Sequence, residues 1–80
     1  MLKLIIASPC PFCLLVTDFI KNNSITSVQI HDTCWDEKEH ATLRERYGKS
    51  QVPLLLINDS PLYESLDIIN YLKENHAHTK

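Results

Sequence analysis

The first third of the chain contains a continuous apolar run, followed by apolar residues at the spacing of a helix. Residues 1–7 are apolar except for Lys3, which is typical of a buried parallel strand. From Pro11 onward the apolar residues recur every three or four positions, which predicts a helix with one apolar face. That face comprises Phe12, Leu15, Val16, Phe19 and Ile20, and Asn22-Asn23 ends the helix. A second short strand is indicated by Ile25, Val28 and Ile30.

The middle of the chain predicts a polar, largely exposed helix. Asp36 and Glu39 have the spacing of a capping box, in which both side chains satisfy free backbone N–H groups. The helix should run through Tyr47 and end at Gly48, a residue that readily adopts the left-handed conformation. Its apolar residues are sparse, namely Ala41, Leu43 and Tyr47.

The last third predicts a hairpin followed by a helix. Residues 52–57 form an apolar strand with Pro53 at its start, and Asn58-Asp59-Ser60-Pro61 is a turn signal that leaves Leu62-Tyr63 as a minimal fourth strand. The helix predicted over 64–75 carries Leu66, Ile68, Ile69 and Leu72, and residues 76–80 form a polar tail. The order β-α-β-α-β-β-α predicts an α/β fold with a mixed four-stranded sheet flanked by helices, its first two strands parallel and its last two forming a hairpin.

Composition narrows the class of protein. Eighty residues allow a single domain, 1–80, and 44% hydrophobic with 22% charged residues is ordinary for a folded globular protein. A net charge of −2 predicts no nucleic-acid or anionic-membrane partner. The opening apolar stretch is too short for a signal peptide and no apolar run is long enough to span a bilayer, so we predict a cytoplasmic protein. We also expect a monomer.

The pair Cys10 and Cys13 lies just after a predicted strand and at the start of a predicted helix. A helix N-terminus presents free N–H groups and a partial positive charge, and both favour a thiolate over a thiol. Cys10, before the first full turn, is therefore predicted to be the exposed nucleophile. Cys13, one turn into the helix, is predicted to be the shielded resolving thiol, close enough to attack a mixed disulfide on Cys10.

Other interpretations of the cysteines stay open at this point. A Cys-x-x-Cys pair is also half of a zinc site, which Cys34 with His31 or His40 would complete from a different element. Two inert, buried cysteines are a further alternative. Cys34 itself is expected to be an ordinary loop thiol, and Trp35 is expected to cover an edge of the core. We expect the side chains of His40, His76 and His78 to be solvated at the surface.

Val52-Pro53 is a second landmark. Proline at the start of a strand is tolerated because its missing N–H is not needed there. A cis peptide at this bond would turn the Val52 backbone toward Cys10 and offer its N–H and C=O groups to a peptide-like substrate. The trans form is the ordinary state of an X-Pro bond, and only the nearby cysteine motif favours cis.

With these residues in view, the chain resembles a glutaredoxin over nearly its whole length. The resemblance rests on Cys10-Pro11-Phe12-Cys13, on Val52-Pro53 and on Glu64-Ser65, a pair that is also similar to the Glu-Ser motif of glutathione transferase N-terminal domains. It implies a thioredoxin-like fold that binds glutathione. Glu64 and Ser65 would hold the γ-glutamyl end, the Val52 backbone would pair with the cysteinyl part, and Pro11, Phe12 and Pro53 would complete the site.

The sequence also departs from the glutaredoxin pattern. Ala7-Ser8-Pro9 offers no lysine shortly before Cys10, Gln51 stands where threonine is usual, and Pro61-Leu62-Tyr63 replaces a pair of small residues. The glycine carboxylate of glutathione therefore lacks its usual cation, and we expect Lys49 and Gln51 to substitute for it. Phe12 and Tyr63 are expected to flank the active site.

The resemblance implies a glutathione-dependent thiol–disulfide oxidoreductase. It would reduce protein disulfides and glutathione mixed disulfides with glutathione as cosubstrate, with no tightly bound cofactor and no metal. One alternative is a thioredoxin-like electron donor served by a flavin reductase; another is a non-catalytic iron–sulfur or zinc module, against which Pro11 beside Cys10 argues. The helical domain of glutathione transferases does not follow in these eighty residues, so glutathione transfer to electrophiles is not expected.

Overall fold

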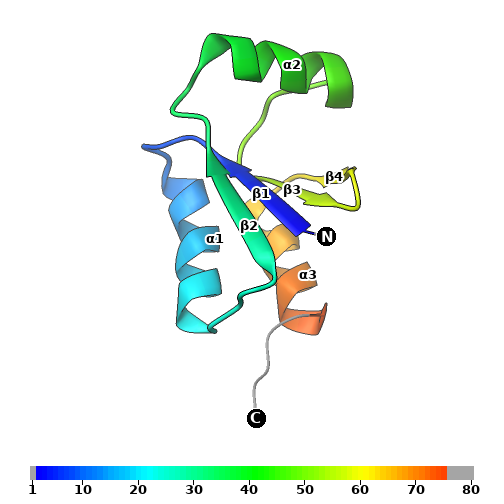
Figure 1. The fold of residues 1–80 in the computed structure, drawn as a ribbon. Coiled ribbons are helices and arrows are strands. Elements are labelled where there is room, and N and C mark those ends of the chain that lie inside the picture. The colour runs from blue at the N-terminus through cyan, green and yellow to red at the C-terminus, as the bar shows by residue number, and fades with distance from the viewer. Residues whose placement is uncertain (1, 76–80) are drawn as a thin grey trace.

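The computed structural model describes residues 2–75 and contains the elements in the predicted order (Figure 1). These elements are β1 (Leu2–Ile6), α1 (Pro11–Asn22), β2 (Val28–Asp32), α2 (Glu37–Tyr47), β3 (Leu54–Ile57), β4 (Ser60–Leu62) and α3 (Ser65–Asn75). The predictions for Met1, for the polar tail and for His76 and His78 lie outside the described residues.

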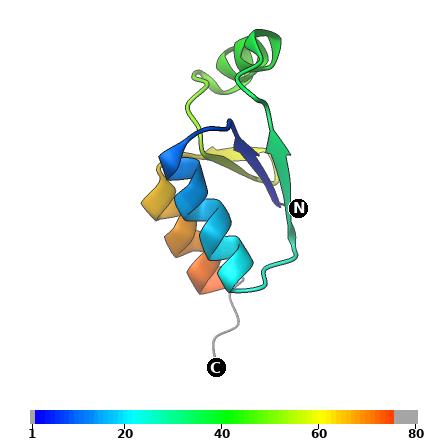
Figure 2. The ribbon, with the colours of Figure 1, turned by 90° about the vertical axis from the view of Figure 1, so that its left-hand side faces the viewer.

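The strands form one mixed sheet in the order β2-β1-β3-β4. β1 is parallel to β2 and antiparallel to β3, so that Leu4 pairs with Ile30 on one side and with Leu55 on the other. β3 and β4 form an antiparallel hairpin. Figure 2 shows α1 and α3 side by side on one face of the sheet, with α2 set apart from them. The predicted α/β class and the mixed four-stranded sheet are therefore confirmed.

The hydrophobic core is divided by the sheet because successive side chains of a strand point to opposite faces. Leu4 of β1 faces α1 and α3, where it joins the fully buried residues Val16, Leu55, Ile68 and Leu72. Its neighbour Ile5 faces the other side, where it packs with Leu54, Leu56 and Leu43 of α2. The larger cluster fixes α1 against the sheet and so fixes the position of the cysteine pair.

The ends of α2 are those that the sequence predicts. The Asp36 side chain accepts a hydrogen bond of 3.0 Å from the backbone N–H of Glu39. Gly48 ends the helix at φ 90° and donates its N–H to the carbonyl of Arg44. The reciprocal half of the predicted capping box is replaced, because the Glu39 carboxylate pairs with Nε2 of His31 at 2.8 Å.

The hairpin turn is shorter than predicted. Asn58 and Asp59 both have positive φ, 50° and 74°, which is the conformation of a tight two-residue hairpin turn. β4 therefore begins at Ser60 instead of Leu62, and Pro61 lies within this edge strand, where a missing N–H is tolerated. The third strand begins at Leu54, two residues later than predicted.

The second strand lies later in the chain than predicted. β2 covers Val28–Asp32, whereas Ile25 precedes it and donates its backbone N–H to the carbonyl of Ile20. Ile25 is 7% exposed and joins the larger core from this turn. Its apolar character reflects burial and not membership of a strand.

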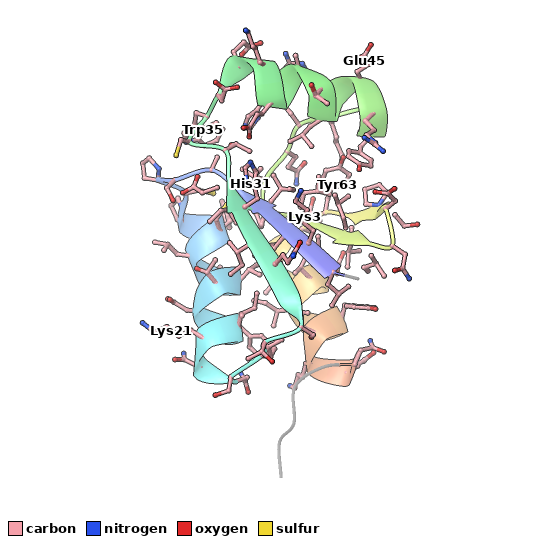
Figure 3. The ribbon with its side chains drawn as sticks, in the orientation of Figure 1. Lys3, Lys21, His31, Trp35, Glu45 and Tyr63 are labelled. Atoms are coloured by element: carbon pink, nitrogen blue, oxygen red, sulfur yellow. The ribbon has the colours of Figure 1, made fainter. Side chains whose placement is uncertain are left out.

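The prediction that His40 is solvated is wrong. Its side chain is 5% exposed, and its Nε2 lies 2.8 Å from the hydroxyl of Thr33. Trp35 stacks on it with ring centroids 5.3 Å apart. Trp35 is itself 53% exposed and covers His40 instead of an edge of the hydrophobic core, as its position in the loop before α2 allows (Figure 3).

Candidate functional site

Cys10 is the N-cap of α1. Its backbone is extended, and its sulfur accepts a hydrogen bond of 3.3 Å from the backbone N–H of Cys13. Pro11 follows at the first helical position, where its missing N–H costs nothing. The sulfur of Cys10 thus lies at the positive end of the helix dipole, where a thiolate is stabilised.

The two thiols occupy different environments. Cys10 is partly exposed, whereas Cys13 is 3% exposed and belongs to the larger core cluster. Burial raises the pKa of the Cys13 thiol to about 12, and its hydrogen bond with Cys10 contributes in the same direction. This asymmetry is the one expected for an exposed nucleophile beside a shielded partner.

A groove of about 510 Å³ adjoins the first turn of α1. Six of the predicted binding residues line it together, and they come from α1, from the segment before β3 and from the start of α3: Phe12, Gln51, Val52, Pro53, Glu64 and Ser65. The peptide bond between Val52 and Pro53 is cis, the less common of the two forms weighed from the sequence. Leu15, Leu66 and Asp67 also line the groove and were not among the predicted site residues.

Several residues that line the groove are polar or acidic. Glu64 precedes α3 at φ 72°, and its carboxylate accepts a hydrogen bond of 3.3 Å from the side-chain amide of Gln51. Ser65 and Asp67 belong to the first turn of α3. These residues therefore offer two carboxylates, a hydroxyl and the free N–H groups of a helix N-terminus to a ligand that carries both an ammonium and a carboxylate group.

Other residues that line the groove are apolar and exposed. Phe12, Leu15 and Leu66 are 61%, 50% and 68% exposed. The helical periodicity placed Phe12 and Leu15 on the buried face of α1, but the buried residues of that helix are Cys13, Val16 and Ile20. The spacing of Leu15 one turn after Phe12 was the available signal that both side chains share a surface.

Lys49 is not among the residues that line the groove. Its ammonium lies 4.5 Å from the centroid of the Tyr63 ring, and the Tyr63 hydroxyl donates to the Lys49 carbonyl. Burial raises the pKa of that hydroxyl. Figure 3 shows Tyr63 at the hairpin, below α2. In this conformation the Lys49 ammonium makes a cation–π contact with the Tyr63 ring.

Metal-binding clusters and membrane-spanning helices are both absent from residues 2–75. Within that range no three His, Cys, Asp or Glu side chains come together in a group able to hold a metal ion. None of the helices described there is long and apolar enough to cross a membrane.

Comparison with known proteins shows the family to which this chain belongs. Residues 4–80 match the model of the glutathione S-transferase N-terminal domain. The chain therefore belongs to the family of glutathione S-transferase N-terminal domains, whose fold is thioredoxin-like. The match confirms the similarity to glutathione transferase N-terminal domains, whereas the resemblance to glutaredoxins stays a prediction. No curated protein matches the sequence.

Solved structures with the same fold include several glutathione S-transferases. A glutathione S-transferase from the Antarctic clam Laternula elliptica is 25% identical with a TM-score of 0.77, and the match covers 94% of this chain and 35% of that one. Human glutathione-S-transferase T1-1 in its apo form is 25% identical with a TM-score of 0.79, covering 92% of this chain and 31% of that one. A diazinon-metabolizing enzyme of the silkworm Bombyx mori is 20% identical with a TM-score of 0.79, covering 95% and 38%. The chain thus spans less than two fifths of each of these structures.

Proposed function

We propose that this protein is a cytoplasmic, glutathione-dependent thiol–disulfide oxidoreductase that reduces protein disulfides and glutathione mixed disulfides. The observation that carries the proposal is the position of Cys10, whose sulfur caps α1 and accepts the N–H of Cys13, two residues before Phe12 in the groove lining. A helix N-terminus favours negative charge, and the thiolate is the form of a cysteine that attacks a disulfide.

The groove supports glutathione as the thiol partner. Glutathione carries an ammonium and a carboxylate on its γ-glutamyl end. Glu64 and Ser65 both line the groove. In the proposed complex the Glu64 carboxylate receives the ammonium, while Ser65 and the first N–H groups of α3 receive the carboxylate. The backbone of Val52 lines the same groove and offers N–H and C=O groups to the cysteinyl part.

The reaction balances in two exchanges. The Cys10 thiolate attacks the glutathione sulfur of a mixed disulfide, and the substrate thiolate leaves and takes up a proton. A second glutathione, as thiolate, then attacks the glutathione sulfur now bonded to Cys10, which forms glutathione disulfide and returns the Cys10 thiolate. The net reaction converts one mixed disulfide and one free glutathione into the substrate thiol and glutathione disulfide.

The test is a coupled assay in which NADPH and glutathione reductase recycle glutathione and a glutathionylated peptide is the substrate. Cys10→Ser should abolish turnover because the attacking thiolate is lost, whereas Cys13→Ser should leave most of it. Cys34→Ser, at an exposed cysteine outside the groove, is the matched control and should behave as wild type. Activity retained by Cys10→Ser, or no activity in the wild type, would contradict the proposal.

A second candidate function is the transfer of glutathione to an electrophile. The exposed apolar residues of the groove lining favour it, since Phe12, Leu15 and Leu66 suit an apolar cosubstrate better than a charged peptide. Conjugation of glutathione to an aryl halide, followed by absorbance, tests this reaction directly.

Reduction of the Cys10–Cys13 disulfide by a flavin-containing reductase in the absence of glutathione would instead favour a thioredoxin-like electron donor.

A further inference from the structure

The side chains that line the groove carry negative charge and no positive charge. Glu64 and Asp67 are among the lining residues, and both are exposed. Within residues 2–75, no lysine, arginine or histidine belongs to the lining. The positive element of the groove is the N-terminus of α3, whose free N–H groups receive the γ-glutamyl carboxylate in the proposed complex. Bound glutathione would therefore keep a second carboxylate, on its glycine, without an opposite charge.

The two side chains predicted from the sequence to receive the glycine carboxylate have other partners. The side-chain amide of Gln51 donates to the Glu64 carboxylate at 3.3 Å, so it is bonded to an acid of the groove itself. The Lys49 ammonium lies 4.5 Å from the centroid of the Tyr63 ring, and Lys49 is not a lining residue. Neither group is placed to neutralise a ligand carboxylate.

The arginines of α2 have partners as well. The guanidinium of Arg44 donates to the hydroxyl of Ser50, which precedes Gln51, but it also pairs with the Glu37 carboxylate at 2.9 Å. The guanidinium of Arg46 lies 3.9 Å from the Asp59 carboxylate at the hairpin. Each arginine therefore already faces an acid of the protein, and neither lines the groove.

We infer that the groove selects a γ-glutamyl thiol whose C-terminal carboxylate is neutralised by an amide bond to an amine, in preference to glutathione itself. This inference rests on the proposed function and names the class of its thiol cosubstrate. The amide removes the one charge that the groove does not match. It leaves the ammonium, the γ-glutamyl carboxylate and the thiol unchanged, so the two disulfide exchanges are the same.

The selection has two physical causes. A carboxylate that enters the groove loses part of its hydration, and no positively charged side chain replaces the lost contacts with water. The carboxylate also shares the groove with Glu64 and Asp67, which carry charge of the same sign. Because these two residues are exposed, the repulsion is modest and is screened by salt.

The experiment measures binding without redox chemistry. Three S-methylated ligands, which cannot form disulfides, are titrated by calorimetry into the reduced full chain. They are S-methylglutathione, its C-terminal amide, and the amide that it forms with ethylenediamine, which keeps a free ammonium. At neutral pH the net charge of the ligand rises by one unit at each step of this series, from negative through zero to positive. The γ-glutamyl and cysteinyl parts are identical in all three.

We expect the dissociation constant to fall about two- to fivefold at each step when the salt concentration is about 10 mM. The differences should nearly vanish at about 1 M salt, where charges at exposed sites are screened. Asp67→Asn removes one of the two charges of the groove, so the cationic ligand should lose about twofold in affinity.

Glu45→Gln is the matched control for Asp67→Asn. It makes the same change of charge at an exposed residue of α2 whose side chain points away from the sheet (Figure 3). Its three dissociation constants should match those of the wild type. A loss of affinity for the cationic ligand as large as that of Asp67→Asn would contradict a local effect of the groove charges.

Three results would overturn the inference. The first is binding of S-methylglutathione that equals or exceeds that of its amide. The second is a series that Asp67→Asn and salt both leave unchanged. The third is a Lys49→Ala variant that loses affinity for S-methylglutathione and not for the amide, which would show that the Lys49 ammonium leaves Tyr63 to bind the glycine carboxylate.

Failure of the proposed function gives a different pattern. Absent turnover of the wild type in the coupled assay, with the expected order of affinities retained, would contradict the redox activity and leave the selection by charge standing. Binding of none of the three ligands would overturn both the selection and glutathione as the thiol partner.

Discussion

At the scale of single residues, the site depends on two cysteines one helical turn apart whose surroundings differ. Cys10 is the N-cap of α1 and is partly exposed, whereas the Cys13 side chain is packed among core residues. The sequence predicted this difference because a helix N-terminus places the first residue of a Cys-x-x-Cys pair outside the helix and the second within it. The hydrogen bond between Asp32, the last residue of β2, and the backbone N–H of Ser8 was not predicted, because it joins residues 24 positions apart.

His40 is the polar residue whose burial the sequence did not predict. It lies between the Thr33 hydroxyl and the Trp35 ring, so its environment is set by a loop and not by the helix that carries it. We expect His40→Ala to lower the free energy of unfolding by about 1–3 kcal/mol, since it removes buried packing and leaves the Thr33 hydroxyl with one partner fewer. Urea denaturation followed by Trp35 fluorescence measures the change.

The matched control is His31→Ala. His31 pairs with Glu39 at the surface, where both side chains are more than 40% exposed, so the loss should be at most about 1 kcal/mol. Equal destabilisation by the two substitutions would contradict the structural role assigned to His40.

At the scale of elements, helix ends that are determined by residues nearby in the chain were predicted well. The bounds of α2 follow from Asp36 and Gly48, and each acts within one turn of the helix. The sequence pattern predicts the start of β4 two residues late because Pro61 is typical of a turn, whereas positive φ at Asn58 and Asp59 closes the turn earlier. The exposure of Phe12 and Leu15 in the groove was not predicted, because periodicity identifies an apolar face of α1 but not how much of it the sheet covers.

Gly48 provides a test at this scale. It ends α2 at φ 90°, and a Cβ added there would have no neighbouring atom within 4 Å, so a substitution meets only the backbone cost of the left-handed conformation. We expect Gly48→Ala to lower the free energy of unfolding by about 1 kcal/mol. Chemical denaturation measures the total, and hydrogen exchange of the last turn of α2 locates the loss.

Gly48→Asn is the informative comparison. Asparagine tolerates the left-handed region better than alanine does, so Asn should recover part of the stability that Ala loses. An alanine variant as stable as the wild type, or an asparagine variant less stable than alanine, would show that the helix end does not depend on this conformation.

At the scale of the whole molecule, the fold has little stability to spare. A domain of this size buries a smaller fraction of its surface than a larger one, and its main cluster has few fully buried side chains. Leu55, at the centre of the sheet with none of its surface exposed, is one of them. We expect Leu55→Ala to lower the free energy of unfolding by about 2–5 kcal/mol, a large share of the total for such a domain.

Leu14→Ala is the control for Leu55→Ala. Leu14 is 59% exposed on α1, so its truncation should change the free energy of unfolding by no more than about 0.5 kcal/mol. Thermal unfolding followed by circular dichroism compares the two variants. A cost for Leu14→Ala close to that of Leu55→Ala would show that the exposed side of α1 is covered in solution.

The burial of Cys13 in the main cluster links electron transfer to folding through a closed thermodynamic cycle. Under the proposed reaction, the difference in unfolding free energy between the disulfide and dithiol forms equals the difference in redox free energy between the folded and unfolded pair. A change of about 1.4 kcal/mol in this free-energy difference shifts the reduction potential of a two-electron couple by about 30 mV. The reduction potential of this protein is therefore a property of its whole interior, and a methyl group removed from Val16 or Ile68 can alter it while both sulfurs stay untouched.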